Sequence, residues 1–152
     1  MTTEAFLDTA RQLLATWIST ATQPAPNRLD VKIGAADLLA AADALHSALW
    51  GYLSAITGLD DMKANEIEVL YHFCNRAAVA TLRVRISRDK AAIPSICSIK
   101  AGATFFEREL SEMFGIEVLG TPNTDRLFLP DEWPTDNPPL RKDFVVPEPV
   151  EN

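Results

Sequence analysis

The chain has 152 residues, of which 47% are hydrophobic and 23% are charged, so it has the composition of an ordinary globular protein and the length of one domain. Its net charge is −7, and the whole excess lies from Glu107 onward, where there are eleven acidic and four basic residues. Phosphate would repel such an acidic segment, so the charge argues against nucleic acid or anionic lipid as a partner and favours a basic protein surface.

The N-terminal third predicts two helices with a short strand between them. Apolar residues recur at helical spacing over 4–19, and Pro24 and Pro26 are expected to end this first helix. Residues 29–33 alternate between apolar and polar side chains and predict a strand, and the Ala- and Leu-rich stretch 35–49 predicts a second helix.

The middle of the chain predicts β-structure. Residues 52–57 have the pattern of a strand followed by a turn at 58–61, and 93–99 is expected to add a short segment. Alternation over 66–73 and 81–86 predicts an antiparallel pair of strands with one buried face and one solvated face. On the solvated face, acids of one strand are expected to face arginines of the other. These residues are Glu66, Glu68, Arg83 and Arg85.

A third helix is predicted just before the acidic segment. Thr104 and Glu107 have the spacing of a capping box, and Gly115 is placed for the left-handed residue that ends a helix. Together the elements predict an α+β fold over 1–115, with helices packed on a mainly antiparallel sheet. Residues 116–152, called the tail below, are rich in proline and lack any period. They predict an extended, irregular segment that binds a partner, because such a segment cannot pair its own backbone groups regularly.

No cofactor and no metal ion are expected. An Fe–S cluster or a structural zinc needs about four ligands, whereas this chain has two cysteines and two histidines at isolated positions, Cys74, Cys97, His46 and His72. Isolated cysteines also fit a reducing cytoplasm. The longest uncharged runs hold sixteen residues, fewer than the ~20 mainly apolar residues of a membrane span, so no direct membrane insertion is expected.

The glutamates of the third helix leave one enzymatic alternative open. Arg108 to Glu112, followed by Gly115, resemble part of the Nudix box, in which clustered glutamates hold a divalent metal for pyrophosphate hydrolysis. The match fails at two carboxylate positions, which hold Met113 and Lys100. A small metal-dependent, Nudix-like hydrolase is therefore the alternative to a binding function.

Several short motifs follow one another in a fixed order from the third helix to the end of the tail. They are Glu107-Arg108-Glu109, Glu112-Met113-Phe114-Gly115-Ile116, Gly120 with Pro122, Arg126-Leu127, Pro130-Asp131 with Trp133, and Pro139-Leu140-Arg141-Lys142-Asp143-Phe144. In this order they resemble the signature of the 30 kDa subunit of respiratory NADH:quinone oxidoreductase (complex I). The same subunit type occurs in energy-converting, membrane-bound NiFe hydrogenases. The resemblance is strongest over 104–144.

The resemblance implies a structural subunit without a redox cofactor and without a catalytic site of its own. Such a subunit packs beside a large hydrogenase-like or quinone-module subunit and a small Fe–S subunit. It would be cytoplasmic, peripheral on the inner face of the cell membrane through its complex. A free adaptor domain that acts outside such a complex is a third possibility.

The resemblance and the chemistry of the side chains together predict eleven partner-binding residues. They are Glu107, Arg108, Glu109, Arg126, Asp131, Trp133, Leu140, Arg141, Lys142, Asp143 and Phe144. The basic residues of the tail are expected to pair with partner carboxylates, and its acidic ones with partner bases or helix ends. The aromatic residues and the leucine would be buried against the partner, because buried aromatics dominate interface energetics. Arg108 is expected to make a partly buried bridge within the subunit or to the tail.

Overall fold

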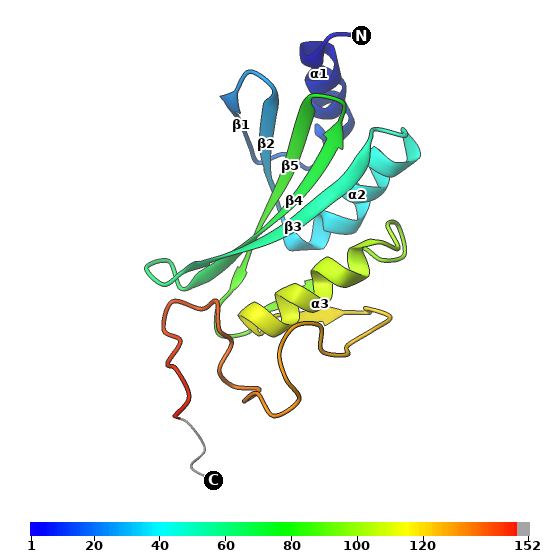
Figure 1. Cartoon of the computed structure of the whole chain (residues 1–152). Coiled ribbons are helices and arrows are strands. Elements are labelled where there is room, and N and C mark those ends of the chain that lie inside the picture. The colour runs from blue at the N-terminus through cyan, green and yellow to red at the C-terminus, as the bar shows by residue number, and fades with distance from the viewer. Residues whose placement is uncertain (149–152) are drawn as a thin grey trace.

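The computed structural model describes residues 1–148, in which five strands form one sheet in the order β1-β2-β5-β4-β3. The strands are β1 Thr20–Ala25, β2 Arg28–Ile33, β3 Tyr52–Asp61, β4 Glu66–Asn75 and β5 Ala78–Ser87. All neighbours pair antiparallel except β2 and β5, which are parallel. The helices are α1 Thr3–Leu14, the single-turn 3-10 helix η1 Ala35–Asp37, α2 Leu38–Ser47 and α3 Ala103–Phe114. This mainly antiparallel sheet with packed helices (Figure 1) confirms the predicted α+β class.

A second, two-stranded sheet lies under α3. Strand β6, Ala92–Pro94, pairs in parallel with β7, Glu117–Leu119. Strand β6 falls at the start of the short segment expected at 93–99. Strand β7 lies just beyond the division between 1–115 and the tail, and that division stays a prediction. The tail has neither helix nor strand from Gly120 to Glu148, and residues 149–152 lie outside the described part of the chain.

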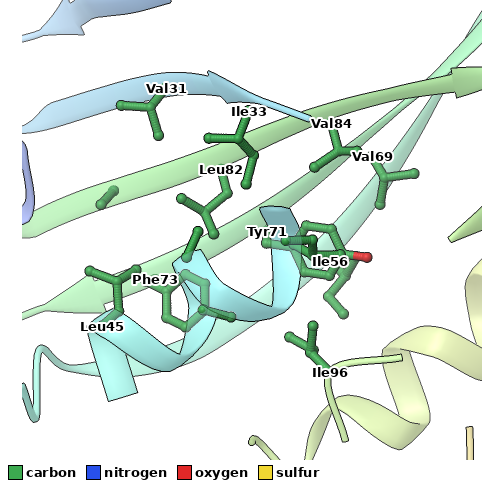
Figure 2. Close-up of a cluster of buried hydrophobic side chains, with 14 of the residues drawn as sticks. Val31, Ile33, Leu45, Ile56, Val69, Tyr71, Phe73, Leu82, Val84 and Ile96 are labelled. Carbon is green, nitrogen blue, oxygen red and sulfur yellow. The ribbon is translucent and has the colours of Figure 1, made fainter. Parts of the chain in front are cut away.

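The hydrophobic core lies between the sheet and the helices. The side chains of Ile67, Val69, Tyr71 and Phe73, alternate residues of β4, are fully buried, as is Leu82 of β5. Figure 2 shows this face of the sheet turned towards α2. Burial of each of the aliphatic and phenylalanine side chains stabilises the fold by about 1.5–3 kcal/mol, so the period-two pattern of the hairpin fixes which face the helices cover.

The opposite face of the sheet carries ion pairs between neighbouring strands. Arg83 donates from Nε and Nη2 to the two carboxylate oxygens of Glu68, at 2.9 and 2.8 Å. Arg85 donates to Glu66 at 2.8 Å. The prediction that these acids face these arginines is confirmed. The Arg83 guanidinium holds the pKa of Glu68 below its ordinary value, against the opposing effect of burial.

The structure corrects the predicted end of the first helix. Helix α1 ends at Leu14, and the chain then forms the edge strand β1 instead of continuing in a helix to residue 19. Pro24 lies inside this strand. Proline lacks the N–H that a central strand must donate, but an edge strand has one side without a neighbour, so proline is tolerated there.

The predicted turn at 58–61 is wrong, because β3 continues through Asp61. Gly58 lies within the strand, opposite Val69 of β4, where the ring of Phe114 from α3 covers it. A Cβ atom at Gly58 would lie 2.5 Å from Cε2 of Phe114. The glycine therefore allows a close approach of helix and strand and does not mark a turn.

The predicted capping box is also wrong. Gly102 precedes α3 without a side-chain cap, and Thr104 lies inside the helix. The carboxylate of Glu107 is buried and points towards the segment before the helix, where it accepts hydrogen bonds from the backbone N–H of Ile96 at 2.7 Å and from Ser95 Oγ at 2.8 Å. The other end of the helix is as predicted, because Gly115 has φ +65°.

The close approach at Gly58 gives a test of the fold. We expect Gly58→Ala to lower the free energy of unfolding by about 1–3 kcal/mol, because the buried Phe114 ring must move to admit the methyl group. Gly102→Ala is the matched control, since no atom lies within 4 Å of its added Cβ. Chemical denaturation of the three proteins measures the difference. Equal stability of the two variants would contradict the packing described for Gly58.

Candidate partner-binding surface

Helix α3 holds the first part of the tail through two side chains one turn apart. Arg108 donates from Nε to the carbonyl of Asp125 at 2.8 Å and from Nη2 to the carbonyl of Arg126 at 2.7 Å. Glu112 accepts the backbone N–H groups of three consecutive residues at 2.7, 2.9 and 3.3 Å. These residues are Leu127, Phe128 and Leu129. A segment without regular structure thus finds partners for its backbone on a helix of the same chain.

The next part of the tail is closed on itself by Arg126. Its guanidinium donates to the carbonyl of Pro130 at 3.0 Å and to the carbonyl of Trp133 at 2.7 Å. The indole N–H of Trp133 donates to the carbonyl of Asn137 at 3.0 Å. Its ring stacks on Phe144, with centroids 6.0 Å apart and planes inclined by 13°. These contacts give the loop a defined shape.

The end of the tail is held by a buried ion pair between β3 and the residue that follows β5. Arg88 donates to both carboxylate oxygens of Asp60, at 2.8 and 3.1 Å, and also pairs with Asp143. The same Asp60 accepts the backbone N–H of Lys142 at 2.8 Å. Arg88 holds the pKa of Asp60 below its ordinary value, and the Lys142 N–H acts in the same direction.

Arg141 and Leu140 join this end of the tail to the C-terminus of α3. Arg141 donates to the carbonyl of Phe114 at 2.7 Å and to the carbonyl of Arg88 at 3.2 Å. The backbone N–H of Leu140 donates to the carbonyl of Met113 at 2.9 Å. The last carbonyls of a helix lack intrahelical donors, and the tail supplies them here. Figure 1 shows the tail, orange to red, passing along α3 towards the hairpin of β3 and β4.

The structure divides the eleven predicted site residues into two groups. One group makes contacts within the chain, either between the tail and the body, within the tail itself, or in the buried cluster around Glu107. Its members are Glu107, Arg108, Arg126, Trp133, Arg141, Asp143 and Phe144. The other group has side chains on the surface or at its edge. Its members are Glu109, Asp131, Leu140 and Lys142, of which Glu109 is half-buried beside Leu140 in a cavity of about 130 Å³. Binding of a partner by any of the eleven stays a prediction.

The predicted set lacks three residues that position the tail, namely Asp60, Arg88 and Glu112. Asp60 falls in the segment that the sequence predicts as a turn, so its burial could not be expected from the pattern. A sequence signal exists for Glu112, because it opens the motif Glu112-Met113-Phe114-Gly115-Ile116. Its role depends on the fold, since it contacts residues fifteen positions later.

The surface of the tail also presents apolar side chains. Phe128 is 64% exposed and Leu140 is 52% exposed, and Val145 and Val146 are exposed as well. Within residues 1–148, no three His, Cys, Asp or Glu side chains are grouped so that they could hold a metal ion. None of the helices described is long and apolar enough to cross a membrane.

Fold and tail together define the class: an α+β domain that displays an irregular C-terminal segment on its surface. The chain belongs to the family described as "Respiratory-chain NADH dehydrogenase, 30 Kd subunit", whose model matches residues 31–150. The resemblance seen in the sequence is thereby confirmed, and the family match favours the assembly interpretation over the Nudix-like alternative. The geometry agrees, because the carboxylates of Glu107 and Glu112 are engaged by Ser95 and by backbone N–H groups of the chain itself.

Two proteins similar to this chain come from different kinds of complex. The chain is 36% identical to a protein of the NADH-quinone oxidoreductase of Roseiflexus castenholzii over 99 residues, which is 62% of this chain and 55% of that protein. It is 34% identical to formate hydrogenlyase subunit 5 of Escherichia coli over 99 residues, 62% of this chain and 17% of that protein. The chain thus spans about half or less of the length of these relatives.

The fold is also similar to that of one chain in a solved respiratory complex. One chain in the structure of the membrane-bound sulfane sulfur reductase, described as an archaeal respiratory membrane complex, superposes with a TM-score of 0.78 at 23% identity. The superposition covers 91% of this chain and 85% of that one. At this identity the similarity shows the fold alone, including the placement of the helices on the sheet.

Glu112 gives a direct test of how the tail is held. We expect Glu112→Ala to make the amide hydrogens of Leu127, Phe128 and Leu129 exchange about tenfold faster or more, because charge-assisted hydrogen bonds are worth about 1.5–3 kcal/mol each. Glu109→Ala, on the same helix, is the control. Hydrogen exchange followed by mass spectrometry measures the rates. Equal exchange in both variants would show that Glu112 does not hold this segment.

The Asp60–Arg88 pair predicts a pH dependence of stability. The pKa of Asp60 is lower in the folded chain than its ordinary value of 3.8. The ionised carboxylate therefore contributes its full share to the free energy of unfolding above pH 3.8, and this share is lost as the pH falls through the folded pKa. We expect the difference in unfolding free energy between wild type and Asp60→Asn to shrink below about pH 4. Asp131→Asn, an exposed carboxylate, is the control. If this difference in unfolding free energy stays constant until the wild type itself unfolds in acid, the role of Asp60 is contradicted.

Proposed function

We propose that this chain is a structural subunit of a membrane-associated electron-transfer complex. In this proposal it docks beside a large hydrogenase-like or quinone-module subunit and a small Fe–S subunit, and it keeps electron-carrying neighbours in a fixed relation. Membership of the 30 kDa subunit family supports it. The names of the similar proteins, which belong to NADH-quinone oxidoreductase and to formate hydrogenlyase, point to the same kind of assembly.

The tail is the observation that carries the proposal. Its backbone is held on the body by Arg108, Glu112 and Asp60, while Phe128 and Leu140 remain largely exposed. Large apolar side chains exposed on an ordered surface are available to be buried against a partner. A segment already ordered on its own body loses less conformational entropy on binding than a free one, and the difference strengthens binding.

The membrane association of this chain would come from its partners. In the proposal the chain faces the cytoplasm at the inner face of the cell membrane, held there by the complex. The two relatives named above leave a quinone reductase and a hydrogenase-type assembly as the two forms of the complex. Identification of the large subunit that accompanies the chain decides between them, because a NiFe site requires cysteine ligands in that subunit.

Arg141→Glu tests the proposal in the native complex. Arg141 links the tail to the carbonyls of Phe114 and Arg88, so the reversed charge would detach the end of the tail and release the chain from its complex. We expect the variant body to stay folded and to be lost from the complex purified from gently solubilised membranes. Arg28→Glu, on an exposed residue at the start of β2, is the matched control and should remain bound.

Mass spectrometry of the purified complex gives the readout. Recovery of wild type and the control with a large subunit and an Fe–S subunit, together with loss of Arg141→Glu, would support the proposal. Recovery of the wild-type chain alone would contradict it. Retention of folded Arg141→Glu at the wild-type level would show that the tail is not the binding element.

A further inference from the structure

A groove runs between α3, β7 and the tail. It consists of two adjoining cavities of about 390 and 270 Å³. Both are lined by Arg108, Ser111, Glu117 and Thr124, so they form one continuous depression, called the α3–tail groove below. It lies on the side of α3 where Arg108 and Glu112 bind the tail, and it is open to the surface.

The arginines that line the groove are turned towards the chain itself. Arg108 donates to the carbonyls of Asp125 and Arg126, and Arg126 donates to the carbonyls of Pro130 and Trp133. Their planar guanidinium groups are therefore held in place by backbone oxygens. They shape the wall of the groove, and their N–H groups that make these bonds are not offered to a ligand.

Two acids of the groove, by contrast, are exposed, whereas Glu107 and Glu112 are engaged within the chain. Glu117 and Asp125 line it, and both residues are exposed and in no ion pair among residues 1–148. The tail loop that forms one wall, with Leu129, Trp133 and Pro134 in the lining, also carries acidic side chains. These are Asp131, Glu132 and Asp136, all of them exposed. The groove thus combines an apolar wall with two exposed acids, Glu117 and Asp125, which are called its acidic rim below.

We propose that the α3–tail groove binds a basic segment of a neighbouring subunit. Lysine or arginine side chains of that segment would place their ammonium or guanidinium groups at the acidic rim. Their aliphatic stems would lie on the apolar wall, as long basic side chains do on amphipathic surfaces. Nucleic acid and anionic lipid are disfavoured, since the rim would repel phosphate. This inference rests on the proposed function and adds the chemistry of the partner.

The contacts of the tail arginines change which charges of the tail we expect to face the partner. The sequence predicts that Arg126 and Arg141 pair with partner carboxylates, but both guanidinium groups donate to carbonyls of the same chain. Among the tail's basic residues, Lys142 is the exposed one within the described part. The exposed charge is therefore mainly negative, and complementary charge on the partner steers association and excludes other surfaces.

Rebinding to a subcomplex that lacks this chain tests the inference. The probe is the remaining assembly, purified from cells in which the gene for this chain is deleted. The chain is added back as wild type, as Glu117→Lys/Asp125→Lys, and as Glu4→Lys/Asp43→Lys, a control with the same charge change on exposed residues of α1 and α2. Thermal unfolding checks that each variant folds. If the groove variant does not fold, Glu117→Gln/Asp125→Asn replaces it, with Glu4→Gln/Asp43→Asn as its control.

We expect reversal at the groove to raise the Kd about tenfold or more and the control to change it less than about twofold. The difference should shrink as salt is raised towards about 1 M, where the screening length is about 3 Å. Equal Kd values for the groove variant and the control would overturn the inference while leaving the proposed function intact. Failure of the wild-type chain to bind would overturn the proposed function itself. A dimer of the isolated chain that the groove variant abolishes would assign the groove to a second copy and overturn the inference.

Discussion

The buried ion pair between Asp60 and Arg88 is the contact on which the position of the end of the tail depends. The side chains are 1% and 13% exposed, so removing both charges from water carries a cost that only good geometry offsets. Here the geometry is complete, because Arg88 donates to both oxygens of Asp60 and the backbone N–H of Lys142 adds a third bond. The pair joins β3, the residue after β5 and the end of the tail at one point.

The rest of the tail follows the same physical rule. An irregular segment cannot pair its backbone in a ladder, so charged side chains supply the missing donors and acceptors. Glu112 accepts three N–H groups, and Arg108, Arg126 and Arg141 donate to carbonyls. Ordering the tail thus engages its arginines inside the chain, and the side chains left facing outwards are mainly acidic and apolar, with Lys142 as the exposed base. In the proposed complex, this distribution of charge makes the surface selective for a basic partner.

The sequence predicts those parts of this fold that depend on local pattern. Alternation identifies β4 and β5 and the ion pairs between them, and Gly115 identifies the end of α3. The wrong predictions come from tertiary contacts. Gly58 has the pattern of a turn, but its role is set by Phe114, which is distant in sequence and packs against it. Glu107 has the spacing of a cap, but its carboxylate binds Ser95 and Ile96 instead. Within the candidate site, motifs locate the segment, but the carbonyl partners of its arginines follow from the folded path of the tail.

The central claim is that the tail is ordered on the body before any partner binds. Hydrogen exchange of the isolated chain and of the chain in its complex tests this most directly. We predict that the amides of residues 127–129 and of Lys142 are protected in both states, because Glu112 and Asp60 accept them. The amides of Asp131, Glu132 and Asp136, exposed residues of the loop 130–137, should gain protection only in the complex. Tail amides that exchange in the isolated chain as fast as in an unfolded peptide would contradict the claim.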